Sequence, residues 1–133
     1  MGEFEKKINY WLSLADNNID TARILLQNKK YLDAGFYCHQ TIEKALKAFY
    51  WHAKNEEPPY THNLIRLAEM SGLILKMDEA KKDTLDFLMP LNIEGRYPDE
   101  LAFEVSRSDS LEITRIIEST EGLLKWIKAF LKN

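Results

Sequence analysis

Apolar residues recur every three or four positions along most of the chain, which is the spacing of amphipathic helices. The clearest case lies near the N-terminus and extends over several helical turns. Its apolar positions are Phe4, Ile8, Trp11, Leu12, Ala15, Ile19, Ala22, Leu25 and Leu26. The polar run Asn28-Lys29-Lys30 marks the expected end of this helix.

The next predicted helix covers residues 31–54 and carries distinctive side chains on two opposite sides. One side is a small-to-apolar stripe made of Ala34, Cys38, Thr41, Ala45 and Phe49. Because residues three and four apart are neighbours on a helix, a second set gathers on the other side. This set mixes polar and aromatic residues: Phe36, His39, Gln40, Glu43, Lys47 and Tyr50. A purely solvated face rarely carries aromatic residues, so we expect this side to form an interface with a partner.

Three more helices follow the break at Pro58-Pro59, where neither residue can continue a helix. Thr61 is expected to cap a short helix that ends at Gly72. Asp78 is expected to cap the next helix, which stops near Pro90.

The last predicted helix begins at Asp109, which forms a capping-box pattern with Glu112. Its apolar stripe consists of Ile113, Ile116, Ile117, Thr120, Leu124, Ile127 and Leu131. Gly122 interrupts it at a cost of about 1 kcal/mol relative to Ala, which close packing would explain. Before this helix, residues 92–107 show weak periodicity and are predicted to form a long ordered loop, a kind of segment that tends to be functional.

These elements predict an all-α fold without strands. Long amphipathic helices with short connections favour an up-and-down antiparallel bundle of four main helices plus one short helix. A length of 133 residues suits one domain, covering residues 1–133.

Composition narrows the classes of function. Hydrophobic residues make up 45% and charged residues 29%, as in ordinary soluble proteins. A net charge of −3 argues against strong nonspecific attraction to nucleic acid. Neither a signal peptide nor a membrane-spanning run is recognisable, so we expect a cytoplasmic protein without a membrane partner.

Metal or thiol chemistry has little support in the sequence. The single cysteine, Cys38, excludes an intramolecular disulfide and lies on the apolar stripe, where it acts as a small hydrophobe. One Cys and three scattered His cannot form a zinc motif. His39 and Glu43 share a face, and a hydrogen-bonded or ion-paired couple is the favoured interpretation. We expect no metal and no cofactor.

Two positions are candidates for ligand binding. His62 stands at the expected start of the third helix, where it either supports the loop or faces a phosphate at the helix N-terminus. Arg96, Tyr97 and Asp99 occupy the long loop, where Arg and Tyr suit phosphate pairing and base stacking. The same loop residues would equally suit a loop held by an Arg–carboxylate pair.

Three segments together resemble the HEPN domain family (higher eukaryotes and prokaryotes nucleotide-binding). They are Tyr37–Ala48 (YCHQTIEKALKA), His62-Asn63-Leu64 with Leu67, and Arg96-Tyr97-Pro98-Asp99, in the order found in the family. The resemblance implies a bundle of four main helices that commonly dimerises. Many prokaryotic relatives are encoded beside a minimal nucleotidyltransferase, often as toxin–antitoxin modules. Others are metal-independent ribonucleases with a composite site formed across the dimer.

The chain departs from the ribonuclease pattern that the family implies. That pattern is an Arg followed, after four to six residues, by a His near the last long helix. The arginines of this chain are Arg23, Arg66, Arg96, Arg107 and Arg115. None of them has a His at that spacing, and no His follows His62. General acid–base catalysis needs a titratable group at that place. The sequence therefore favours a protein that is not an enzyme.

Three hypotheses follow. The first is a non-catalytic HEPN protein that forms a homodimer through the second side of helix 31–54, with help from the last helix, and binds a nucleotide, a minimal nucleotidyltransferase partner, or both. The second is a divergent metal-independent ribonuclease, a toxin that uses Arg96 with His39 or His62 and takes RNA as its substrate. The third is a purely structural interaction module in which Arg96 and Asp99 hold the loop. A helical bundle alone does not choose among them.

Overall fold

The computed structural model describes residues 2–92 and 110–131, and all regular structure in these ranges is helical. The elements are α1 (Glu3–Gln27), α2 (Tyr31–Lys54), α3 (Leu64–Ser71), η1 (Leu73–Lys76), α4 (Glu79–Leu88), η2 (Met89–Leu91) and α6 (Ser110–Leu131). The predicted all-α bundle is confirmed, and the predicted limits of α2 match those of the structure. Within the described ranges, no helix combines the length and apolar composition that a membrane span requires.

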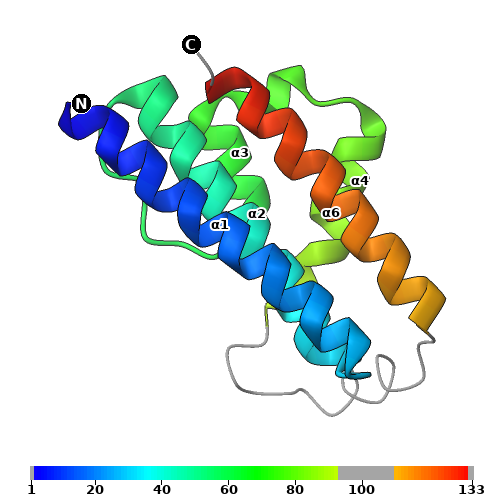
Figure 1. The fold of residues 1–133 in the computed structure, drawn as a ribbon. Coiled ribbons are helices and arrows are strands. Elements are labelled where there is room, and N and C mark those ends of the chain that lie inside the picture. The colour runs from blue at the N-terminus through cyan, green and yellow to red at the C-terminus, as the bar shows by residue number, and fades with distance from the viewer. Residues whose placement is uncertain (1, 93–109, 132–133) are drawn as a thin grey trace.

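Helix α2 lies at the centre of the bundle (Figure 1). Helix α1 runs antiparallel to α2 along its length, and α6 packs on both of them. In the view of Figure 1, the short helix α3 lies behind α2, and α4 lies behind α6. The start of α1 and the end of α6 lie at the same end of the bundle.

The small-to-apolar stripe of α2 is buried as predicted, with Ala34, Cys38, Thr41, Ala45 and Phe49 all in the core. The large aliphatic side chains that are fully buried with it come from α2, α3, η1, α4 and α6: Ile42, Leu46, Leu64, Leu67, Leu73, Leu85, Leu88 and Ile127. Each such aliphatic side chain contributes about 1.5–3 kcal/mol through its removal from water. The core therefore needs neither a metal nor a disulfide to hold α2 in place.

The cap of α3 differs from the prediction. Asn63 is the N-cap, and its side-chain oxygen accepts a hydrogen bond from the backbone N–H of Arg66 at 2.9 Å. Thr61 instead accepts from the N–H of Asn63 at 3.1 Å, which stabilises the turn before the helix. The prediction that Thr61 caps α3 is therefore wrong by two residues. The predicted cap of α4 is confirmed, because Asp78 accepts from the N–H of Lys81 at 2.9 Å.

Two helical glycines have different surroundings. A Cβ at Gly35 would lie 3.2 Å from Cδ1 of Leu91, so a glycine at this position lets η2 approach α2 closely. A Cβ at Gly122 would meet nothing within 4 Å. Packing against the described residues therefore does not explain Gly122.

Candidate functional site

Most of the predicted site residues within the described ranges meet in one polar cluster at the junction of α2, residues 55–63 and η2. We call it the Glu43 cluster. Helix α2 contributes the larger part, and the segment before α3 and the residue after η2 complete it. Its members are His39, Gln40, Glu43, Lys44, Lys47, His62 and Asn92.

The Glu43 carboxylate is the centre of the cluster, and its side chain is only 2% exposed. Its Oε1 accepts a hydrogen bond from Nδ1–H of His62 at 2.8 Å. Its Oε2 accepts from Nζ of Lys47 at 3.1 Å, and Nζ of Lys44 lies 3.7 Å away. Burial alone would raise the pKa of Glu43, but the His62 hydrogen bond and the lysine charges outweigh it and lower that pKa. Glu43 is therefore an ionised, compensated buried charge.

His39 is fully buried and hydrogen-bonds to the backbone of the segment before α3. Its Nε2 lies 3.1 Å from the carbonyl oxygen of His62, and because a carbonyl only accepts, Nε2 carries the proton. Nδ1 is then the acceptor that faces the side-chain amide of Gln40 at 3.4 Å. Burial lowers the pKa of His39 to about 4, against the attraction of Glu43 and the hydrogen bond to the carbonyl. The imidazole is neutral at physiological pH.

Lys47 links the cluster to α1. Its side chain is 8% exposed, and its Nζ lies between the Glu43 carboxylate and the indole of Trp11, 5.2 Å from the ring centroid. This geometry is that of a cation–π interaction, which strengthens as it loses water. A second contact of the same kind places Nζ of Lys7 5.7 Å from the ring centroid of Trp51. The second side of α2 therefore meets cationic and aromatic groups from its own chain.

The structure buries most of the residues that were predicted to form an interface. Four of its six residues lie buried within the single chain: His39, Glu43, Lys47 and Tyr50. Phe36 and Gln40 keep intermediate exposure. The physical reason is that helical spacing assigns residues to a face without showing what covers that face. Here α1 and the segment 55–63 cover it.

The cluster reaches the surface at His62, whose side chain is 32% exposed. The ring of Tyr60 lies edge-on to His62 with centroids 5.9 Å apart, and Tyr60 is 94% exposed. Lys44 lies at the other oxygen of the Glu43 carboxylate and donates to the side-chain oxygen of Gln40 at 2.8 Å. An exposed aromatic ring can stack on a base, and the partly exposed imidazole beside it can hydrogen-bond to a phosphate. Sequence reasoning singled out His62 but missed Tyr60.

The predicted ligand residues Arg96, Tyr97 and Asp99 lie outside the described residues, as does Asp109 of the expected capping box. They follow Asn92, whose side-chain oxygen accepts from Nε2 of Gln40 at 3.4 Å. The described part of that chain segment therefore ends at the Glu43 cluster.

Metal and thiol chemistry find no site in residues 2–92 and 110–131. No group of three or more His, Cys, Asp or Glu side chains there could hold a metal ion. Burial raises the pKa of the Cys38 thiol to about 12, against a hydrogen bond with Thr120. A thiol with this pKa is protonated at neutral pH and is a poor nucleophile.

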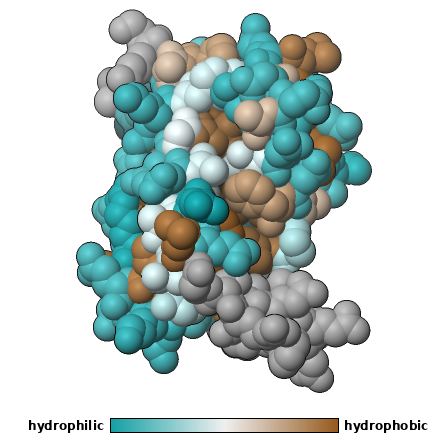
Figure 2. All heavy atoms as spheres, turned by 90° about the vertical axis from the view of Figure 1, so that its right-hand side faces the viewer, coloured by the Kyte–Doolittle hydropathy of each residue, from teal (hydrophilic) through white to brown (hydrophobic). Residues whose placement is uncertain are grey.

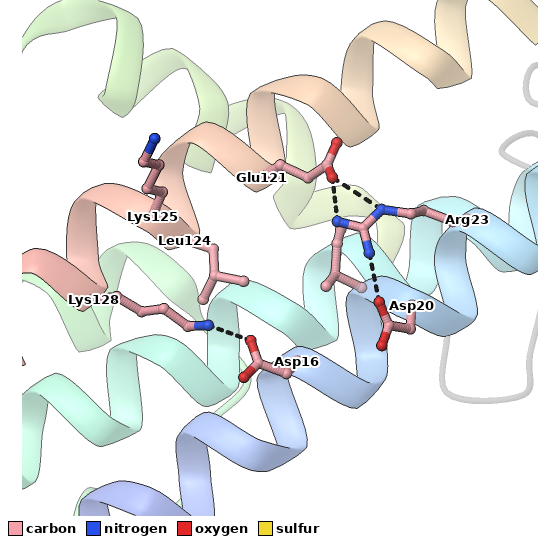
Figure 3. Close-up of a pocket in the computed structure, with 8 residues that line it drawn as sticks. Asp16, Asp20, Arg23, Glu121, Leu124, Lys125 and Lys128 are labelled. Atoms are coloured by element: carbon pink, nitrogen blue, oxygen red, sulfur yellow. Dashed lines mark hydrogen bonds and ion pairs between the residues drawn. The ribbon is translucent and has the colours of Figure 1, made fainter.

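A second polar site is a charged groove between α1 and α6 (Figure 3). Arg23 donates from Nε to Glu121 at 2.9 Å and also pairs with Asp20, while Lys128 pairs with Asp16. The hydrogen bond to Glu121, first among several causes, raises the pKa of Arg23. Because the charges pair across the groove, this site joins the two helices. Sequence reasoning missed it because the partners are 98 and 112 residues apart.

Comparison with known proteins agrees with this architecture. The family model described as "HEPN domain" matches residues 8–130. The chain belongs to the HEPN domain family. Among solved structures, this HEPN domain is similar to the crystal structure of TT1696 from Thermus thermophilus, at 21% identity and a TM-score of 0.78. The match covers 92% of this chain and 97% of that chain, and at this identity it shows the fold alone. No curated protein matches this HEPN domain.

Burial of His39 predicts a loss of stability in mild acid. Its pKa is about 4 in the folded chain and 6.5 when unfolded, so the unfolded state takes up a proton first as pH falls. The free energy of unfolding therefore decreases by about 3 kcal/mol as the pH falls from 6.5 toward 4. Urea unfolding of the wild type and of His39→Gln between pH 7 and pH 4.5 measures this decrease. The variant should lose less stability over this range, whereas His52→Gln, at an exposed His, should match the wild type. Equal losses in all three proteins would contradict the assignment.

The two polar sites predict different responses to removal of a carboxylate. Glu43→Gln leaves two lysines beside a neutral buried group, and we expect a loss of about 3 kcal/mol or more in the free energy of unfolding. Glu121→Gln removes the partner of Arg23 in a pair that is 43% and 38% exposed, and we expect a loss below about 1 kcal/mol. Denaturant titration at pH 7 compares the two variants. Similar losses would refute the central place given to Glu43.

Proposed function

We propose that this HEPN domain is a non-catalytic binding protein. It forms a homodimer and binds a nucleotide, a minimal nucleotidyltransferase partner, or both, in the setting of a toxin–antitoxin module. The observation that carries the non-catalytic part is the Glu43 cluster. Its titratable groups hold one another and the backbone of residues 55–63, which leaves His39 without access to a substrate.

The nucleotide part is supported by the surface at the edge of the cluster. Tyr60 offers an exposed ring with His62 beside it, and Lys44 lies 3.7 Å from the Glu43 carboxylate that His62 also contacts. A base stacked on Tyr60 would place its phosphates near these groups. Base–aromatic stacking is worth about 1–3 kcal/mol per base. The same surface tolerates different bases, because every base has a π-face.

This surface predicts which tyrosine matters for binding. We expect nucleoside triphosphates to bind in calorimetric titration, and Tyr60→Ala to weaken binding at least about fivefold through loss of stacking. Tyr10→Ala, at a tyrosine that is 57% exposed on α1, is the matched control and should bind like the wild type. Absence of binding by all four common nucleotides at millimolar concentration would refute the nucleotide part.

The partner part has a separate test. Purification of the tagged protein from its native cells, followed by mass analysis of bound proteins and small molecules, should recover a nucleotidyltransferase. Recovery of the protein alone, from cells that express an adjacent nucleotidyltransferase gene, would refute it.

A divergent metal-independent ribonuclease is the second candidate, and one observation favours it. Glu43 fixes the ring of His62 through Nδ1, and the His62 side chain is partly exposed. A carboxylate-oriented imidazole is suited to proton transfer. In this candidate Arg96 would stabilise phosphate charge. Incubation of several RNAs in chelator tests it: cleavage that Arg96→Ala or His62→Gln abolishes would support it, and intact RNA would exclude it for those substrates.

A further inference from the structure

The face formed by α4 and α6 carries a groove of about 600 Å³ (Figure 2). Pale and brown residues run down the middle of this face, with hydrophilic residues on both sides. Lys81 and Phe87 of α4 and Ser119, Gly122 and Trp126 of α6 are among the residues that line the groove.

Aromatic side chains stay open to solvent along this groove. Phe87 on α4 is 39% exposed. Trp126 on α6 is partly buried, and Nζ of Lys81 lies 4.9 Å from its ring centroid, which holds the indole at the groove wall. An apolar groove with a charged border is typical of a surface that another molecule covers.

Gly122 lies in the interior of α6 at the edge of this groove. A glycine there costs about 1 kcal/mol relative to Ala, and a Cβ would meet nothing within 4 Å. The described residues therefore give no reason within the monomer for a missing side chain. A backbone bare of a side chain lets another backbone come close.

The charged residues beside Gly122 are arranged to fit a second copy of α6. Glu118 and Lys125 are both exposed and lie on one flank of Gly122, four residues before it and three after it. Among the described residues, neither of them makes an ion pair. If a second α6 crosses antiparallel at Gly122, the two-fold axis brings Glu118 of each copy to Lys125 of the other. The two pairs form together, so the pattern is complementary to itself.

The opposite flank of Gly122 is complementary to itself in shape. Ser119 lies three residues before Gly122 and Trp126 four residues after it, and both line the groove. The same two-fold axis sets the large indole of one copy against the small hydroxyl side chain of the other. A large group thus meets a small one twice, which favours close contact between the helices.

We propose that α6 of this chain packs antiparallel on α6 of a second copy, with the crossing at Gly122 and the 119–126 flank of each copy at the α4–α6 groove of the other. This inference rests on the homodimer of the proposed function and assigns it a surface. It also moves that surface away from the second side of α2, which the chain itself covers.

A charge-swap cycle tests this interface. Sedimentation equilibrium should give the wild type a mass near twice the 15.6 kDa of the chain. Glu118→Lys and Lys125→Glu should each weaken the dimer about tenfold, because two attractive pairs become repulsive. The double variant Glu118→Lys/Lys125→Glu should restore wild-type affinity. Glu69→Lys, the same charge change at an exposed position on α3, is the control and should have no effect.

The outcomes separate this interface from the proposed function. A wild type that is a monomer at tens of micromolar would overturn both the homodimer and this interface. A wild-type dimer that neither single variant weakens, or that the double variant fails to restore, would overturn the interface and leave the homodimer standing. Gly122→Arg gives an independent check, since a long side chain at the crossing should dissociate the dimer without unfolding the monomer.

Discussion

One buried carboxylate, that of Glu43 on the central helix, constrains the elements packed around it. An ionised group away from water is stable only when charge and hydrogen bonds compensate it. Here His62 does so from the segment before α3, and Lys47 and Lys44 do so from α2. Lys47 also faces Trp11, so the same charge joins α1 to the cluster. One side chain thus connects the central helix, its neighbour and the connecting segment.

This constraint bears directly on function. His39 is neutral, closed to solvent and hydrogen-bonded to the backbone of the segment 55–63, whereas His62 is held by Glu43 and partly exposed. Two surfaces of the described residues are open to other molecules: the edge at Tyr60 and His62, and the face of α6 beside the α4–α6 groove. Both surfaces are suited to binding. The proposed binding function rests on these two surfaces.

Much of the fold was predictable because helices leave local signals in a sequence. The limits of α2, the Asp78 cap and the buried stripe from Ala34 to Phe49 follow from periodicity and capping chemistry. The cover of the second side of α2 was not predictable, since spacing shows which residues share a face and not what lies against it. The Arg23–Glu121 pair joins residues far apart in the chain, for which no local signal exists. The choice of Asn63 over Thr61 as a cap depends on where the backbone enters the helix.

If the polar side of α2 is an internal network, the protonation of its imidazole nitrogens will show it. Two-bond ¹⁵N–¹H correlation spectra distinguish the protonated from the bare nitrogen of each histidine ring. Our account predicts that His39 at pH 6 is neutral and protonated at Nε2, and that its spectrum changes little between pH 7 and pH 5. A His39 ring that titrates near its ordinary pKa of 6.5, like a histidine open to solvent, would contradict it.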